Sequence, residues 1–295
     1  MAHLLAAFVY WAYVTDKNGQ TVYRIDGDTN TVLDSVAGAI FAEPFDLAIT
    51  PSGEYTYVSN RVVGKVYKID LSTFTVLGTA TSDSFISPSE IAITPDNKYA
   101  YVTDAARSTV DYIDIESNVV MGSIRYNSFN SLQGIAITPD GSCAYITDTI
   151  GGQIYQIDLL TDSVLGVVMD ATFNDPWGIA IAPRGLDAYA TDLGTEEVYQ
   201  IQIATNKVVG QVTGASFIYP YNMAITPDTE TDLVYKIDLT TNQVMATVSG
   251  AVFLSLSSSH RSDCRSCDTD YFRFANTYHG SYCFRVRPPG QSEKE

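Results

Sequence analysis

The residues that could bind a metal are concentrated near the C-terminal end of the chain. Cys264, Cys267, His279 and Cys283 follow the spacing Cys-x2-Cys-x11-His-x3-Cys, and His260 lies just before them. Zinc in proteins is held by four sulfur and nitrogen ligands at spacings of this kind. The pattern therefore predicts a zinc site of three cysteines and one histidine, with free or disulfide-linked thiols as the alternative.

The rest of the chain lacks the side chains of the common nucleophilic mechanisms. No histidine lies between His3 and His260, which excludes a Ser-His-Asp or Cys-His arrangement from this part. Carboxylates such as Asp46 and Glu90, together with Arg61, are the groups that could still activate water and stabilise an oxyanion. Because nothing in their spacing singles them out, we predict no catalytic residue.

Aspartates recur at positions that resemble turns and the ends of strands. Twelve of them repeat through the chain: Asp16, Asp26, Asp70, Asp96, Asp104, Asp114, Asp140, Asp148, Asp158, Asp192, Asp228 and Asp238. Aspartate side chains accept hydrogen bonds from nearby backbone amides in turns. We therefore favour a structural role over calcium binding, and we expect no resident cofactor.

These residues are set in a repeat of 44 residues. A Tyr-x-(Thr/Ser)-(Asp/Asn) motif begins at Tyr13, Tyr57, Tyr101, Tyr145 and Tyr189. An Ile-(Thr/Ala)-Pro motif and an Ile-Asp or Ile-Gln pair recur with the same period. Each period contains four short segments of β-branched and aromatic residues, separated by Gly, Pro and Asp. This pattern is typical of a β-propeller, in which each repeat forms one blade of four antiparallel strands.

The composition limits the partners of such a fold. Seventeen Lys and Arg residues against 34 Asp and Glu residues give a net charge of −17, which would repel a phosphate backbone. We therefore expect no nucleic-acid partner. The longest apolar run, residues 4–14, is about half the length that a membrane-spanning helix requires, so we expect no membrane span.

The residues that vary between repeats are the best candidates for binding. In a propeller, the connection from an outer strand to the next inner strand lies on the face that usually binds ligands. These connections begin with a repeated phenylalanine that we expect to pack between blades: Phe41, Phe85, Phe129, Phe173 and Phe217. At their ends, variable residues are predicted to surround the channel mouth and bind a sugar or peptide: Phe45, Asp46, Glu90, Gln133, Trp177, Tyr221 and Asn222. The alternative is that these are ordinary variable loops.

The tetrapeptides of the repeat also point to a family. YVTD at residues 13–16, YVSN at residues 57–60 and YVTD at residues 101–104 resemble the YVTN-type β-propeller repeat, over roughly residues 12–253. That family occurs in surface-layer and other secreted bacterial and archaeal proteins and is related to lactonase-like propellers. The resemblance implies an extracellular or cell-surface location, although no signal peptide is visible. It does not fix a function, because one fold serves many functions.

The repeat is broken in two places. Ile201 and Ile237 are 36 residues apart rather than 44, so the sixth unit is expected to lack its second strand. After Phe253 no repeat marker follows, and residues 254–295 form a Cys-, Arg- and Ser-rich tail. This tail is interpreted as a degenerate last blade, an appendage or an out-of-frame segment. We predict an all-β propeller of six recognisable units in residues 1–253, the sixth shortened, with seven blades as the alternative.

These patterns favour a non-catalytic binding or structural module over an enzyme. The chain begins in the phase of an inner strand, and one unit is short of a strand, so strand edges are expected to be open to another chain. We therefore expect a protein or glycan partner, or assembly of copies into an oligomer or polymer. The alternative function is a lactonase-like hydrolase or isomerase that uses carboxylates at the channel mouth.

Overall fold

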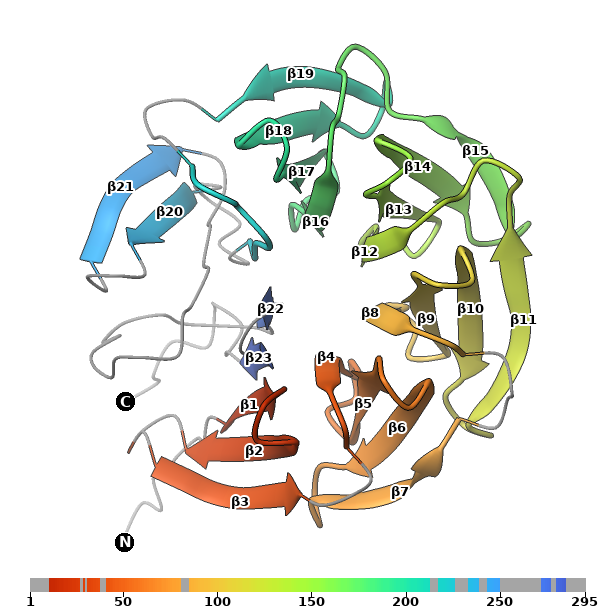
Figure 1. Ribbon diagram of the computed structural model, residues 1–295, viewed down its shortest axis with the longest axis vertical. Coiled ribbons are helices and arrows are strands. Elements are labelled where there is room, and N and C mark those ends of the chain that lie inside the picture. Colours follow the sequence, from red (N-terminus) through yellow and green to blue (C-terminus); the bar gives the residue numbers. More distant parts are fainter. Residues whose placement is uncertain are drawn as a thin grey trace, which may run out of the picture.

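The computed structural model describes most of the first three quarters of the chain in full. It describes residues 11–26, 29, 31–37, 41–80, 85–212 and 217–225, together with the backbone of four strands at residues 233–238, 243–249, 272–276 and 280–284. All regular elements in these ranges are β-strands, and they form antiparallel sheets arranged around a common centre (Figure 1). The fold is therefore all-β and propeller-like, and no helix able to cross a membrane occurs in the part that is described.

Four sheets each contain four consecutive antiparallel strands. One contains β4 (Pro44–Ile49), β5 (Tyr55–Asn60), β6 (Lys65–Asp70) and β7 (Thr75–Thr79). The next contains β8 (Pro88–Ile93), β9 (Tyr99–Asp104), β10 (Thr109–Asp114) and β11 (Val119–Arg125). The third contains β12 (Leu132–Ile137), β13 (Cys143–Asp148), β14 (Gln153–Asp158) and β15 (Ser163–Val167). The fourth contains β16 (Pro176–Ile181), β17 (Asp187–Asp192), β18 (Glu197–Gln202) and β19 (Lys207–Gln211). In each sheet the first strand lies nearest the centre (Figure 1).

The 44-residue period thus corresponds to one sheet, as the sequence predicts. The Tyr-x-(Thr/Ser)-(Asp/Asn) motif forms the second strand, whose residues are almost all buried because neighbouring sheets cover both of its faces. Tyr57 and Tyr145 are fully buried there. The last strand alternates between exposed and half-buried residues, as expected at the periphery.

The predicted packing role of the repeated phenylalanines is confirmed. Phe41, Phe85, Phe129 and Phe173 are all buried in clusters that combine side chains of two neighbouring sheets. Each of three rings meets a tyrosine of the following sheet nearly edge-on, and the Phe129 ring centre lies 4.9 Å from that of Tyr155. Truncating such a buried ring costs roughly 3–5 kcal/mol, so this position is a major source of stability.

The motif aspartates are bound by backbone amides, which confirms their structural role. The Asp192 carboxylate accepts hydrogen bonds from the amides of Asn174 and Asp175 in the connection and from those of Gly194 and Thr195 in its own turn. Asp104 and Asp148 are used in the same way. The motif aspartate therefore links a strand end, a turn and the connection that enters the sheet.

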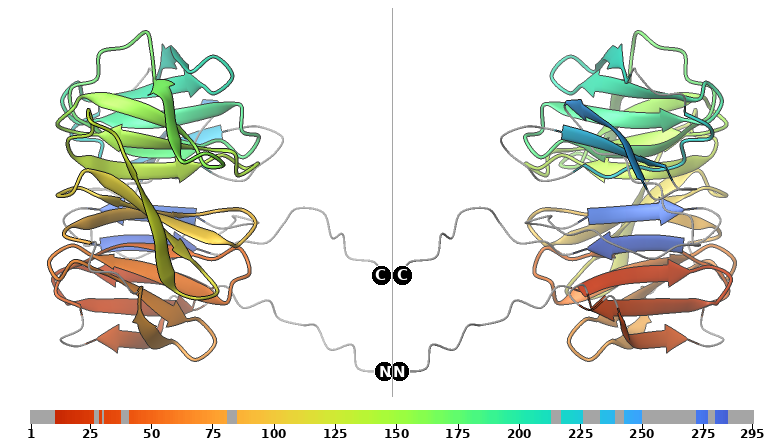
Figure 2. Two further views of the ribbon diagram at one scale, coloured as in Figure 1. Left: turned by 90° about the vertical axis from the view of Figure 1, so that its right-hand side faces the viewer. Right: turned by 90° about the vertical axis from the view of Figure 1, so that its left-hand side faces the viewer.

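The tail contributes strands to the first sheet. This sheet has the order β22–β23–β1–β2–β3, and it contains β1 (Trp11–Asp16), β2 (Thr21–Asp26), β3 (Thr31–Ala37), β22 (Phe272–Asn276) and β23 (Gly280–Phe284). β23 pairs antiparallel with β1, with Val14 opposite Tyr282. The blue strands lie beside the red strands in the side views as well (Figure 2). The inner edge of β1 is therefore paired with the chain's own tail, a pairing that the repeat does not predict.

The sixth unit differs from the others. β20 (Leu233–Asp238) and β21 (Gln243–Ser249) form a sheet that has two strands among the residues described. Residues 221–225, which correspond in the repeat to an inner strand, have no regular pairing. This agrees with the expected loss of a strand from this unit. The predicted inner strand at the chain start falls in residues 1–10, outside the described residues, and the boundary at residue 253 stays a prediction.

Candidate functional site

The structure brings the predicted mouth residues together at one end of the inner strands. Phe45 and Asp46 lie on β4, Glu90 on β8, Gln133 on β12 and Trp177 on β16. Tyr221 and Asn222 lie at the equivalent point of the sixth unit. The connections that lead to these residues cross the face turned towards the viewer in Figure 1. All seven therefore occupy two adjacent repeat positions around the centre of the molecule.

Each inner strand carries these residues in a β-bulge. Pro88 pairs with Asp104 and Ile91 with Val102, so Ser89 and Glu90 together oppose Thr103. The same register shift occurs in β4, β12 and β16. A bulge turns side chains away from the regular alternation of a strand, and bulges are often found beside functional sites. The two variable residues of each unit therefore lie where the regular alternation of the strand does not set the direction of the side chains.

A hydroxyl group of the motif holds each bulge in place. Thr103 Oγ1 accepts a hydrogen bond of 3.1 Å from the amide of Glu90 and donates one of 2.6 Å to the carbonyl oxygen of Gln133 in the next sheet. Thr147 and Thr191 make the same pair of contacts with the sheets that follow them. This explains why the third motif position is Thr or Ser, because a short hydroxyl side chain donates and accepts through a single oxygen atom.

The second residue of the bulge accepts a hydrogen bond from a backbone amide at the edge of the neighbouring inner strand. Asp46 Oδ2 accepts a hydrogen bond of 2.8 Å from the amide of Ile91, and Glu90 Oε2 accepts one of 3.3 Å from the amide of Ile135. An inner strand presents unpaired amides to the channel, and an unpaired buried amide is costly. These two carboxyl groups thus act as links between sheets.

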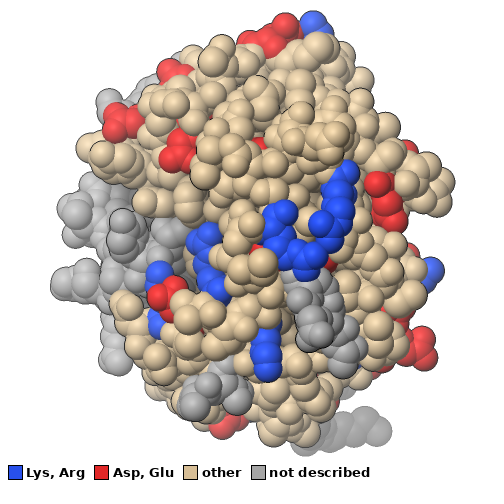
Figure 3. Space-filling view, turned by 45° about the vertical axis from the view of Figure 1, so that its right-hand side comes forward, with Lys and Arg blue, Asp and Glu red and all other residues tan. Residues whose placement is uncertain are grey.

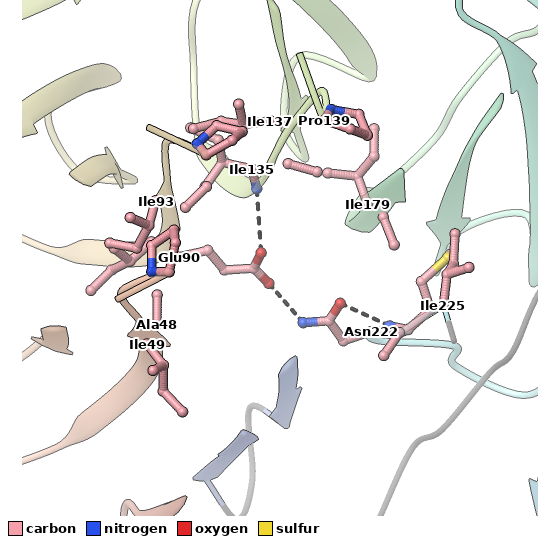
Figure 4. Close-up of a pocket in the computed structure, with 18 residues that line it drawn as sticks. Ala48, Ile49, Glu90, Ile93, Ile135, Ile137, Pro139, Ile179, Asn222 and Ile225 are labelled. Carbon is pink, nitrogen blue, oxygen red and sulfur yellow. Dashed lines mark hydrogen bonds between the residues drawn. The ribbon is translucent and has the colours of Figure 1, made fainter. Parts of the chain in front are cut away.

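Glu90 also bridges the channel. Its Oε1 accepts a hydrogen bond of 2.8 Å from Asn222 Nδ2, and Asn222 Oδ1 accepts one of 2.8 Å from the amide of Met223 (Figure 4). Glu90 and Asn222 occupy the same repeat position three units apart. Figure 4 shows the two side chains reaching towards each other from opposite walls.

Glycines at the two intervening units keep this space free of side chains. A Cβ atom on Gly134 would lie 2.4 Å from the carbonyl oxygen of Trp177, and one on Gly178 would lie 2.6 Å from Asn222 Oδ1. Neither distance is compatible with a carbon atom. Glycine is therefore required at both positions, for the close approach of β12 and β16 and for the placement of the Asn222 side chain.

A second polar cluster closes the channel beside this pair. Arg61 Nη2 donates a hydrogen bond of 3.0 Å to Gln133 Oε1, and Ser89 Oγ donates one of 2.7 Å to the same oxygen. The guanidinium carbon of Arg61 lies 4.3 Å from the centre of the Phe45 ring, a cation–π contact. Burial lowers the pKa of Arg61, although Glu43, Glu90 and Asp104 act in the opposite direction.

The electrostatic environment of Glu90 is unusual. Its side chain is 2 % exposed, and burial raises the pKa of its carboxyl group to about 8, although the bonds from Ile135 and Asn222 and the charge of Arg61 favour the ionised form. Glu90 forms no ion pair with another described residue, unlike Glu43 with Lys17, Asp34 with Arg24 and Asp170 with Lys207. At neutral pH it is mainly a neutral acid.

An apolar cavity lies next to Glu90 and Asn222 along the inner strands. Its volume is about 660 Å³. The walls consist of inner-strand alanines, isoleucines and one methionine, and of the prolines that follow these strands, Pro51, Pro95 and Pro139. Since the prolines follow the last residues of the strands, the cavity extends away from the mouth. Among the described residues that line it, Glu90 and Asn222 have the only polar side chains.

Aromatic residues lie on the other side, at the mouth. The rings of Trp177 and Tyr221 meet edge to face with their centres 5.4 Å apart, and both are half-buried. In the adjoining loop, Ile218 is 77 % exposed and Tyr219 is 63 % exposed. Figure 3 views this face obliquely and shows Lys and Arg side chains near its middle, although the chain as a whole is acidic.

Sequence reasoning missed some of these residues. It considered Arg61 only as a catalytic partner, but the structure ties Arg61 to Phe45 and Gln133. One signal could have identified its place: it follows the motif directly, where the other units carry Lys17, Ala105, Thr149 and Leu193. The apolar inner-strand residues gave no such signal, because alanine and isoleucine there look like ordinary core.

The predicted zinc ligands lie largely outside the described residues. This applies to Cys264, Cys267 and His279, and for Cys283 only the backbone on β23 is described. Within the described part of the chain, no group of three or more His, Cys, Asp or Glu side chains could hold a metal ion. The zinc site stays a prediction.

Comparison with known proteins supports the fold. No protein-family model and no curated protein matches the chain. Among solved structures, a functionally unknown protein from Desulfotomaculum acetoxidans DSM 771 is similar with a TM-score of 0.64 and 15 % identity, over 83 % of this chain and 81 % of that one. Kuenenia stuttgartiensis hydrazine synthase is similar with a TM-score of 0.56 and 26 % identity, over 64 % of this chain. The match spans about half of the hydrazine synthase chain (54 %). These similarities are compatible with a β-propeller.

Proposed function

We propose that this protein is a YVTN-type β-propeller of six recognisable units that acts outside the cell or at its surface as a non-catalytic module, binding a protein or glycan at the channel mouth. The observation that carries the proposal is the half-buried pair of Trp177 and Tyr221 beside the exposed Ile218 and Tyr219. Aromatic side chains that keep one face accessible are the usual anchors for sugar rings and peptide side chains. The repeat motif supports the family and the location.

The arrangement of the carboxyl groups favours binding over catalysis. Asp46 and Glu90, which a lactonase-like mechanism would use, accept hydrogen bonds from backbone amides of the next sheet. Arg61, which would stabilise an oxyanion, donates to Gln133 and stacks on Phe45. Each group therefore has a role in joining sheets, and this role accounts for its position without a substrate.

Binding can be tested with two mouth variants and one peripheral control. Trp177→Ala and Tyr221→Ala should each weaken binding to a glycan or peptide array by about 10-fold or more, as expected for aromatic anchors. Leu77→Ala changes a residue that is 55 % exposed on the outer strand β7 and should leave binding unchanged. The proposal is wrong if both mouth variants bind as the wild-type protein does. Turnover of a simple lactone that is lost in Glu90→Gln would instead support the hydrolase alternative.

Self-assembly is the second part of the proposal. It is supported by the sheet of β20 and β21, which has two strands among the described residues and beside which a strand of another copy could pair. Light scattering over a wide concentration range should show growth of oligomers. A monodisperse monomer throughout that range would remove this part of the proposal and leave the binding role intact.

A further inference from the structure

We propose that the apolar cavity below the mouth is a second binding site, for a small organic ammonium ion with an apolar body, whose ammonium group is bound by the carboxylate of Glu90. This inference goes beyond the proposed function, because it concerns a different ligand class and the other side of the Glu90–Asn222 bridge. The cavity and the mouth share no lining aromatic residue, so the two sites can be tested separately.

The walls determine the apolar part of the ligand. Ile93, Ile137, Ile179 and Ile225 face the cavity from four units (Figure 4). A volume of about 660 Å³ lies within the range of small-molecule sites, which are usually mostly apolar with a few polar groups in fixed positions. Transfer of a hydrocarbon body from water to such walls is favourable and has no directional requirement. A sugar or a nucleotide would leave its hydroxyl or phosphate groups without partners there.

The polar end of the cavity determines the charged part of the ligand. A carboxylate has about four acceptor sites on its two oxygens, and Glu90 uses two of them for Asn222 and the amide of Ile135. Both of these partners are donors. The acceptor sites that remain in the ionised form call for a further donor, and a cation in the cavity would favour that form over the neutral acid. The side chain is almost fully buried and lines the cavity, so this donor comes from a molecule inside the cavity, either water or a ligand. An ammonium group supplies both the donor hydrogens and the positive charge that Glu90 lacks.

Anions and neutral alcohols are disfavoured by the same geometry. Glu90 is the only ionisable group among the described lining residues, so a carboxylate or phosphate ligand would meet no cation from this part of the wall. The charge of Arg61 acts on Glu90, but Arg61 is bound to Gln133 and is not among the described lining residues. A neutral alcohol could donate one hydrogen bond but would not neutralise the carboxylate.

The test uses three probes of equal chain length on the full-length protein. Isothermal titration calorimetry with hexylammonium, 1-hexanol and hexanoate should show that hexylammonium binds at least about 10-fold more tightly than the other two. Glu90→Gln should weaken hexylammonium binding by about 10- to 100-fold, the range for loss of a charged hydrogen bond, and leave 1-hexanol within about 3-fold. Equal affinity for the three probes, or no binding of hexylammonium to the folded wild-type protein, would overturn the proposal.

Two further variants keep the test independent of the folding of Glu90→Gln. Ala136→Leu adds three carbon atoms to the wall of the cavity and leaves Glu90 unchanged, so it should weaken hexylammonium and 1-hexanol alike by about 10-fold. Unchanged binding would mean that the probes bind elsewhere, and the proposal would be wrong. Asp111→Asn alters another fully buried carboxyl group, bonded to Thr109 and Ser123 away from the cavity. It should leave the affinity for hexylammonium within about 3-fold.

Discussion

Replacing Glu90 by glutamine should destabilise the protein at low pH and stabilise it at high pH. Burial raises the pKa of the Glu90 carboxyl group from 4.5 to about 8 in the folded protein. The folded state therefore holds a proton that the unfolded state has lost between these two values. Stability is complete below about pH 4.5 and falls as the pH rises to about 8, with a slope of about 1.4 kcal/mol per pH unit for one proton. Glutamine cannot ionise, so the variant does not lose stability in this way as the pH rises.

The expected magnitudes follow from the contacts of Glu90. Over the whole window the wild-type protein loses at most about 5 kcal/mol through this one group, taking a shift from 4.5 to about 8. Glutamine presents one oxygen and one NH2 group, so it cannot accept from both Asn222 Nδ2 and the Ile135 amide, and it should cost about 1 kcal/mol at pH 4.5. At pH 8.5 the variant should be more stable than the wild-type protein by about 3 kcal/mol.

Urea denaturation of both proteins at pH 4.5, 6, 7 and 8.5 measures this difference directly. Only the difference between the two proteins is used, because other carboxyl groups titrate equally in both. If the difference in unfolding free energy does not change between pH 4.5 and 8.5, Glu90 is not a neutral acid in the folded protein and the reasoning fails. In that case the charge of Arg61 outweighs burial, contrary to the order of causes given above.

Two other substitutions test the contacts between sheets. Thr147→Val removes the hydroxyl that accepts a hydrogen bond from the Gly134 amide and donates one of 2.5 Å to the Trp177 carbonyl oxygen. Because two buried groups lose a partner, urea denaturation should show a free energy of unfolding lower by about 2–4 kcal/mol. The same change at the exposed Thr75 should cost less than about 0.5 kcal/mol, and equal effects at both sites would contradict the assigned role. Gly178→Ala places a carbon 2.6 Å from Asn222 Oδ1 and should destabilise by about 1–3 kcal/mol, whereas Gly166→Ala meets no atom within 4 Å and should be neutral within about 0.5 kcal/mol. A neutral Gly178→Ala would show that the inner strands can separate.

The repeat allowed much of the fold to be predicted. A fixed period carries the positions of strands, turns and packing aromatics from one unit to the next, so Phe129 could be assigned to the contact between sheets from its spacing alone. The short sixth unit could be recognised because the spacing before Ile237 is shorter than the repeat. The tail had no repeat marker, and the pairing of β23 with β1 was therefore not predictable.

The site was predicted in position but not in arrangement. Variation at the bulge identified Glu90 and Asn222 as neighbours of the channel, because the repeat does not require those residue types. Their contact joins units three periods apart, and no local pattern encodes a distance across a channel. The glycines at 134 and 178 were visible as an absence of side chains, but only the structure shows that backbone atoms fill the space.

The pairing of β23 with β1 has a consequence for the order of folding. Contacts between successive sheets join residues 30 or 45 positions apart, so they close short loops and can form one after another along the chain. The contact of Val14 with Tyr282 spans nearly the whole sequence and can form only when both ends are present. We therefore expect this pairing to be the last step during synthesis, and a ribosome-bound chain without its last residues would expose the inner edge of β1 to chaperones and proteases.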